Sequence, residues 1–169
     1  MIQTYSKDEL MERAGTEWEN YRIQVADEYL KAIRDAERRK QLIADERELY
    51  KADLDGLSGI DYSKPNIMTS PSPDAIPNKV LKLLEYSQQL DVLETALDAA
   101  IEDAHKKLLS IEGAAGFVLR LHFMLGFKWE AAFLKAGVSD TKGYELRREG
   151  LLKVYDMGIP EKYGIPEAV

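Results

Sequence analysis

Residues 117–154 read FVLRLHFMLGFKWEAAFLKAGVSDTKGYELRREGLLKV, and this stretch decides the fold. Its apolar residues recur every three or four positions in three runs, which predicts three short helices. Gly126 ends the first run and Gly137 ends the second, because glycine tolerates the left-handed conformation that closes many helices. Ser139 or Asp140 is the expected N-cap of the third helix. Two helices joined by a glycine-containing turn, with basic side chains outside, are the pattern of a helix-turn-helix.

Two long helical stretches precede this motif. Residues 17–55 lack Gly and Pro and carry apolar residues three, four or seven positions apart, which predicts one amphipathic helix. A second helix, over about residues 78–112, has near-heptad apolar spacing that only Ser87 and Glu94 interrupt. Residues 56–77, which are rich in Pro, are the expected loop between them. Two long helices joined in this way are expected to fold back as an antiparallel coiled-coil hairpin.

The ends of the long helices carry signals of their own. Ser6-Lys7-Asp8-Glu9 is a capping box, and we expect it to open a short first helix that Gly15 ends. Gly113-Ala-Ala-Gly116 is the expected hinge between the hairpin and the helix-turn-helix. Pro160 and Pro166 predict an extended C-terminal tail. This tail either lies in an apolar groove of the protein through Tyr155, Ile159, Tyr163 and Ile165 or serves as a peptide that binds a partner.

The predicted protein is therefore all-α and has three parts. Residues 1–112 form the long antiparallel coiled-coil hairpin, residues 113–154 form a small helix-turn-helix domain, and residues 155–169 form the tail. Because each long helix buries only a narrow apolar stripe, self-association or docking of the C-terminal helices should complete the core. A homodimer is the expected assembly.

Residues that usually carry catalysis or bind metals are scarce. The chain has no Cys, and His105 and His122 lie too far apart in the sequence for a metal motif. No glycine-rich phosphate loop, HExxH or GxSxG motif occurs. His122 sits among apolar residues, so a hydrogen-bonded histidine at the edge of the core is favoured over a catalytic base. We therefore expect no enzymatic activity, no cofactor and no metal. With no signal peptide or membrane-spanning run, we also expect a cytoplasmic protein without membrane contact.

Charge is distributed unevenly along the chain. The net charge of −7 argues against a general nucleic-acid binder. Residues 1–116 hold 15 Lys/Arg and 23 Asp/Glu, a net charge of −8, whereas residues 117–153 hold 7 Lys/Arg and 4 Asp/Glu, a net charge of +3. The basic segment is the predicted helix-turn-helix, as expected if this part meets DNA phosphates. A chance fluctuation in a highly charged protein is the alternative explanation.

Two stretches resemble a known family. LRLHFMLGFKWEAA (residues 119–132) is similar to the helix-turn-helix of the sigma-factor domain that binds the upstream promoter element. It resembles more closely the phage and mobile-element regulators of the RinA and ArpU kind. GIDYSKPNIMTSPSPDAIPNKVLKLLE (residues 59–85) resembles the loop that these proteins carry between two long helices. The matching positions of the helix-turn-helix are Leu119, Leu121, Phe123, Gly126, Trp129, Glu130, Gly137, Ser139, Tyr144, Leu146 and Leu151.

The resemblance implies a sigma-like helix-turn-helix that binds double-stranded DNA in a bacterial host cell and regulates transcription. The third helix would enter the major groove, with Arg148, together with Arg147, as the candidate for bidentate recognition of guanine. Glu145 could accept a hydrogen bond from cytosine. The complete set of candidate DNA contacts is Lys128, Lys135, Ser139, Thr141, Lys142, Tyr144, Glu145, Arg147, Arg148 and Lys153.

Four residues depart from the family pattern and motivate a different function. Phe133 replaces a small residue, Gly143 and Gly150 replace core residues, and Glu145 replaces a basic residue. The alternative is a phage protein-binding factor with a degenerate helix-turn-helix and an acidic helical surface. It would act on host RNA polymerase or on another host protein such as a nuclease or a CRISPR effector, as an anti-CRISPR protein does. A structural helical adaptor is the third option.

Overall fold

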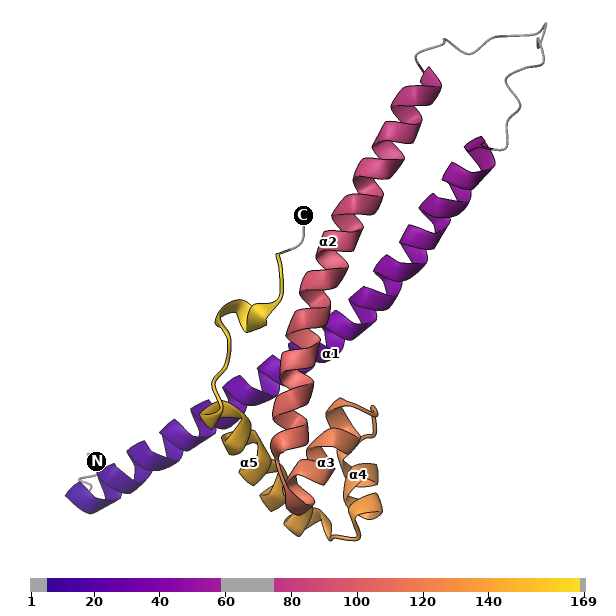
Figure 1. Ribbon diagram of the computed structural model, residues 1–169. Coiled ribbons are helices and arrows are strands. Elements are labelled where there is room, and N and C mark those ends of the chain that lie inside the picture. Colours follow the sequence, from indigo (N-terminus) through magenta and orange to yellow (C-terminus); the bar gives the residue numbers. More distant parts are fainter. Residues whose placement is uncertain (1–5, 59–74, 168–169) are drawn as a thin grey trace, which may run out of the picture.

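The computed structural model describes residues 6–58 and 75–167, and these residues form an all-α protein (Figure 1). The all-α prediction is confirmed, since no strand occurs in the described part of the chain. The elements in chain order are α1 (Lys7–Ser58), α2 (Ala75–Ser110), α3 (Gly113–Phe123), α4 (Trp129–Ala136), α5 (Asp140–Asp156) and a short 3-10 turn, η1 (Glu161–Gly164). None of the described helices is long and apolar enough to span a membrane.

Helix α1 begins at the predicted capping box. The backbone N–H of Ser6 donates to Glu9 Oε2 at 2.8 Å, and the backbone N–H of Glu9 donates to Ser6 Oγ at 3.2 Å. The expected helix end at Gly15 is wrong, because α1 continues through this residue to Ser58. Gly15 faces open space, and a single exposed glycine costs a helix only about 0.5–1 kcal/mol relative to Ala. That cost is too small to end a helix of 52 residues.

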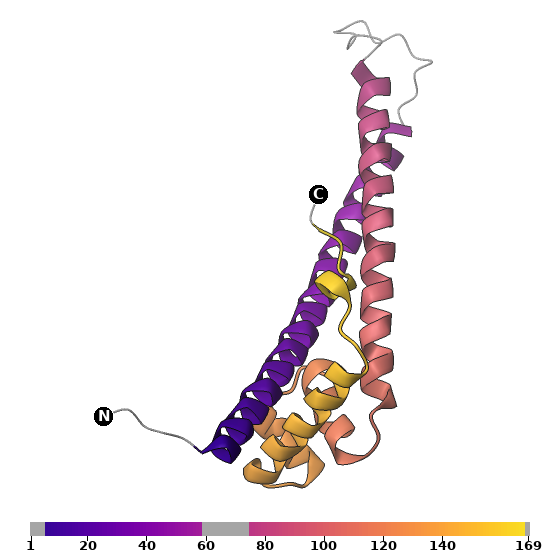
Figure 2. The same cartoon turned by 90° about the vertical axis from the view of Figure 1, so that its left-hand side faces the viewer.

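Helices α1 and α2 run side by side in opposite directions (Figures 1 and 2). Their contact is apolar near the middle of α1, where Ile33 and Ile43 are buried with Leu97 of α2. Farther along it becomes ionic, because Arg47 of α1 pairs with Asp91 at 2.8 Å and with Glu94. Most of the predicted loop, residues 59–74, lies outside the described residues, while the two long helices extend to Ser58 and from Ala75.

The connection from α2 to α3 is fixed by side-chain contacts. The expected hinge, residues 113–116, is wrong, because these residues form the first turn of α3. Gly116 is buried, and a Cβ at this position would lie 1.9 Å from the backbone oxygen of Ile111. This close approach lets Arg120 donate to the carbonyl oxygens of Leu108 and Ile111, both at 2.9 Å. The guanidinium thereby satisfies acceptors that the end of α2 leaves unpaired.

Helices α3, α4 and α5 pack against one end of the α1–α2 pair (Figure 2). One buried cluster connects them, with Tyr29 and Leu30 of α1, Leu108 of α2, Val118 of α3 and Leu151 of α5 among its members. The helices of the predicted helix-turn-helix therefore contribute to the same core as the long helices.

The tail lies along the α1–α2 pair (Figure 2). Its four predicted contact residues are partly buried against the core, and the ring of Tyr163 lies 5.7 Å from that of Tyr29. The prediction of a fully extended tail is wrong over residues 161–164, which form η1. Lys162 and Tyr163 both have positive φ, 51° and 61°, so the chain turns sharply here and returns its apolar side chains to the protein surface.

Candidate nucleic-acid interface

Helices α4 and α5 and their connecting turn have the local geometry that the sequence predicts. Helix α4 covers residues 129–136, and Gly137 closes it in the left-handed conformation with φ of 70°. Ser139 is the N-cap of α5, because its Oγ accepts a hydrogen bond from the backbone N–H of Lys142 at 3.3 Å. Helix α5 extends two residues beyond the predicted end, to Asp156.

Three of the four departures from the family pattern, Phe133, Gly143 and Gly150, lie in the core and pack against each other or against α3. Phe133 of α4 is fully buried, and a Cβ on Gly143 of α5 would lie 2.3 Å from its Cγ. A Cβ on Gly150 would likewise lie 2.6 Å from Leu119 of α3. The large residue in α4 and the two glycines in α5 are therefore complementary, since each glycine leaves the volume that a neighbouring side chain fills.

An aromatic cluster supports the turn between α3 and α4. The imidazole of His122 stacks on Trp129 with ring centroids 3.8 Å apart, and its Nδ1 lies 2.7 Å from the carbonyl oxygen of Phe127. Burial lowers the pKa of His122, which favours the neutral ring with Nδ1–H donating to that carbonyl. His122 is thus a hydrogen-bonded histidine at the edge of the core, as predicted.

The N-terminal half of α5 is exposed on the side opposite the buried Gly143 and Leu146. Four candidate residues share this exposed side: Thr141, Lys142, Tyr144 and Glu145. Tyr144 is 44% exposed, although its ring also contacts Phe133 edge-on at 5.0 Å. Lys142 lies 3.4 Å from Glu145 within the helix, so part of its charge is already balanced.

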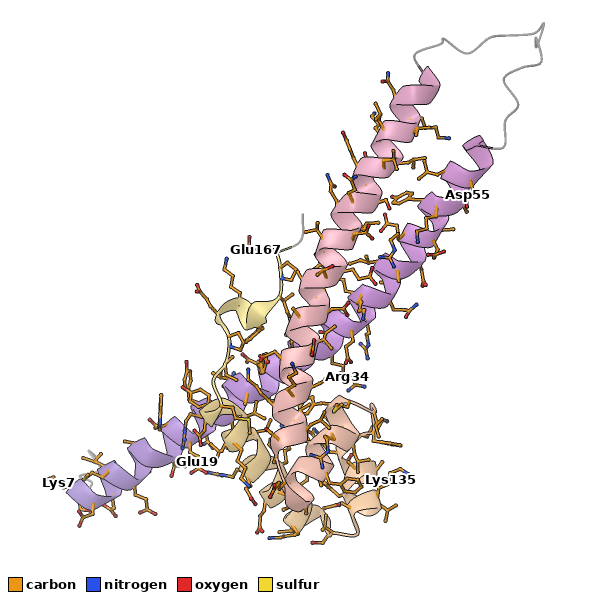
Figure 3. The ribbon with its side chains drawn as sticks, in the orientation of Figure 1. Lys7, Glu19, Arg34, Asp55, Lys135 and Glu167 are labelled. Carbon is orange, nitrogen blue, oxygen red and sulfur yellow. The ribbon has the colours of Figure 1, made fainter. Side chains whose placement is uncertain are left out.

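Three further candidates extend this exposed surface. Ser139 caps α5, Lys128 is the N-cap residue of α4, and both are exposed. Lys135 is exposed near the end of α4, with its Nζ 4.7 Å from the ring centre of Phe127 (Figure 3). Ser139 and Lys135 therefore flank the turn between α4 and α5 and are exposed, while Lys128 is exposed at the other end of α4.

The C-terminal half of α5 faces α1, and this places the two candidate arginines against carboxylates. Arg147 lies above the ring of Trp129 at 4.8 Å and pairs with Asp27 at 3.4 Å. The Nε of Arg148 donates to Oε1 of Glu19 at 2.8 Å. Figure 3 shows Glu19 on the part of α1 that passes α5. The structure therefore brings five of the ten candidates together at the N-terminal end of α5, namely Ser139, Thr141, Lys142, Tyr144 and Glu145. Lys128 and Lys135 are exposed on α4, and Arg147 and Arg148 pair with α1.

Lys153, the last candidate, lies on α5 beyond the exposed N-terminal half. Its Nζ pairs with Glu149 at 2.9 Å, one turn earlier in the same helix. Such an exposed i,i+4 pair contributes little to stability, so this lysine stays accessible to another anion.

Sequence reasoning missed the contribution of α1. Asp27 is only 8% exposed and also pairs with Lys31 at 2.6 Å. Arg34 lies beside the α3–α4 turn, since a Cβ on Gly126 would be 3.3 Å from its Nη2 (Figure 3). Glu19, Asp27 and Arg34 are seven or eight positions apart, which places them on one side of α1. The spacing of these three residues can be read from the sequence and indicates one charged side of α1. It does not show that this side faces α5 and the α3–α4 turn.

Among the described residues, no cluster of His, Asp and Glu could hold a metal ion. Comparisons with family models, curated proteins and solved structures found no match to this chain.

Proposed function

We propose that the protein is a DNA-binding transcriptional regulator of a phage or mobile element, acting in the cytoplasm of a bacterial host. The observation that carries this proposal is the division of α5 into two halves. Its Ser139-capped N-terminal half presents an exposed side with Thr141, Lys142, Tyr144 and Glu145, while Arg147 and Arg148, farther along the helix, pair with carboxylates of α1. In a helix-turn-helix the N-terminal residues of the second helix contact the base edges, so the half that must be accessible is accessible here.

The roles of the candidates follow from their positions on this surface. Tyr144 and Glu145 face outward and would contact base edges, with Thr141 beside them. The phosphate contacts would come from Ser139 and from the four lysines, Lys128, Lys135, Lys142 and Lys153. Arg148 would contact DNA only after it leaves Glu19, and Arg147 would orient α5 on α1.

The first experiment is a salt titration of binding to a mixed pool of random and genomic DNA, with sequencing of the retained fraction. Retention of one motif, with log K falling as log salt rises, would support a site-specific regulator. Lys142→Ala should weaken binding and make the salt slope shallower by about one, whereas the matched control Lys51→Ala, near the other end of α1, should leave both unchanged. Absence of retained DNA at about 50 mM salt would reject the proposal.

A second candidate function, a protein-binding factor, is favoured by the pairing of the basic residues. Arg147 and Arg148 are matched by carboxylates of α1, and Lys142 by Glu145, so the module presents little unbalanced positive charge. The acidic body would then bind a basic surface of host RNA polymerase or of another host protein. A purified complex that survives nuclease treatment, combined with a lack of DNA binding, would support this function.

We also propose that the protein is a homodimer. The first turns of α1 extend beyond the other helices (Figure 1), and residues 6–18 are exposed throughout. Apolar side chains follow one stripe of this segment and of the turn after it, namely Leu10, Met11, Trp18 and Tyr21, each more than half exposed. Sedimentation of the full chain, compared with the Trp18→Glu variant, tests self-association through this stripe. A wild-type monomer at micromolar concentration would contradict it.

A further inference from the structure

We propose that Glu19 of α1 competes with DNA phosphate for Arg148, so that α1 lowers the affinity of the helix-turn-helix for DNA. This inference rests on the proposed function. It adds an intramolecular regulation to the proposed DNA-binding surface, carried by a residue outside the helix-turn-helix.

The contact itself has the chemistry of a phosphate contact. The Nε of Arg148 donates to Oε1 of Glu19 at 2.8 Å, a distance typical of a charge-assisted hydrogen bond. This hydrogen bond is the main cause that lowers the pKa of Glu19, so the carboxylate is ionised at neutral pH. A guanidinium recognises carboxylate and phosphate through the same donors. While Glu19 holds Arg148, the group that would contact DNA is occupied.

The neighbouring pair shows why Arg148 is the exchangeable arginine. Asp27 is buried, Arg147 has 28% of its side chain exposed, and the guanidinium of Arg147 also lies over Trp129, so this pair is part of the packing. Arg148 and Glu19 lie nearer to solvent, with side chains 45% and 32% exposed. A pair at this exposure contributes little to stability, so an anion in the solvent can compete for it.

Arg148 also lies close to the exposed side of α5 that would face DNA. It is three residues after Glu145 and four after Tyr144, so it lies beside two outward-facing candidates, one turn farther along the helix. Rotation about its own side-chain bonds can move the guanidinium from Glu19 toward an anion bound at the exposed half of α5. The exchange therefore requires no movement of the α5 backbone, which the buried Leu146 and Leu151 hold in place.

The test uses the full chain and the isosteric variant Glu19→Gln. Because an exposed ion pair is weak, loss of the charge should raise affinity for a DNA duplex only modestly, about two- to five-fold. It should also steepen the salt slope by about one, since one more cation meets phosphate. The matched control is Glu28→Gln, which removes the same charge from an exposed position of α1 whose carboxylate accepts a hydrogen bond from Gln24. It should change affinity much less.

A double-mutant cycle separates competition for Arg148 from a general effect of charge. In the Arg148→Ala background, Glu19→Gln should give no gain, because the competing arginine is absent. A gain that persists in that background, or that equals the gain from Glu28→Gln, would overturn the inference while DNA binding itself remained established. Failure of every variant to bind DNA at low salt would instead reject the proposed function and this inference together.

Discussion

The packing of Phe133 against Gly143 predicts that Gly143→Ala destabilises the protein, whereas helix propensity predicts that it stabilises the protein. By propensity alone, Gly143→Ala should stabilise α5 by about 0.5–1 kcal/mol. The structure predicts destabilisation, because the new Cβ would lie 2.3 Å from Cγ of Phe133. Phe133 is fully buried and flanked by Trp129 and Tyr144, with ring centroids 6.0 and 5.0 Å away, so its ring cannot swing into solvent.

The size of the effect follows from two opposing contributions. Adding a methyl group to a well-packed core costs about 1–3 kcal/mol, and the gain in helix propensity returns up to about 1 kcal/mol. Because the new Cβ would lie only 2.3 Å from Cγ of Phe133, the packing cost should be in the upper part of its range, about 2–3 kcal/mol, and the net destabilisation for Gly143→Ala about 1–2 kcal/mol. For a chain of this length, that corresponds to a decrease in Tm of about 2–8 °C.

Thermal and urea unfolding of the full chain, followed by circular dichroism, measures this change. Thr141→Ala is the matched control on the exposed side of the same helix and should stay within about 0.5 kcal/mol of wild type. Phe133→Ala alone should cost about 3–5 kcal/mol. The double variant should cost less than the sum of the two single variants, because each change relieves the defect of the other. A Gly143→Ala protein as stable as wild type would refute this account of the packing.

Three further changes test other contacts. Gly116→Ala should destabilise the protein at least as much as Gly143→Ala, because its Cβ would meet the backbone oxygen of Ile111 at 1.9 Å and a carbonyl cannot rotate away; thermal unfolding measures it. Arg120→Met should cost about 1–3 kcal/mol in urea unfolding, since the carbonyl oxygens of Leu108 and Ile111 lose their charged donor. Burial lowers the pKa of His122, so the unfolded chain binds this proton more readily. The contribution of His122 to the free energy of unfolding should be complete above pH about 6.5 and decrease below it. Urea unfolding of wild type and His122→Gln at several pH values should show this decrease as a change in the difference between their unfolding free energies.

Local chemistry predicted the features that depend on neighbouring residues. The bounds of α4, the left-handed Gly137 and the Ser139 cap all follow from residues within one turn of each other. The capping box at Ser6 follows in the same way. In each case the backbone hydrogen-bonding groups at a helix end must be satisfied locally, and few residue types can do so.

Three glycines show where local chemistry is insufficient. The sequence predicts a helix end at Gly15 and a hinge at Gly116, and both predictions are wrong, whereas Gly143 appears in the sequence only as a departure from the family pattern. In the structure Gly15 faces solvent, Gly116 admits a guanidinium to the end of α2, and Gly143 admits a phenyl ring. The same residue type has three different consequences because the neighbour that decides each one lies on another turn or another helix.

The charge that residues 117–153 present to DNA also depends on residues elsewhere in the chain. This dependence gives a prediction for the salt dependence of DNA binding. Of the seven basic residues in this segment, Arg120 caps α2, and Arg147 and Arg148 pair with carboxylates of α1. Only the four lysines, at positions 128, 135, 142 and 153, remain accessible to DNA. Since each phosphate contact contributes about −0.9 to the slope of log K against log salt, one module should give a slope near −4 and a dimer near −7. A measured slope steeper than these values would mean that Arg148 leaves Glu19 when DNA binds, and a slope near zero would mean that the lysines do not contact DNA.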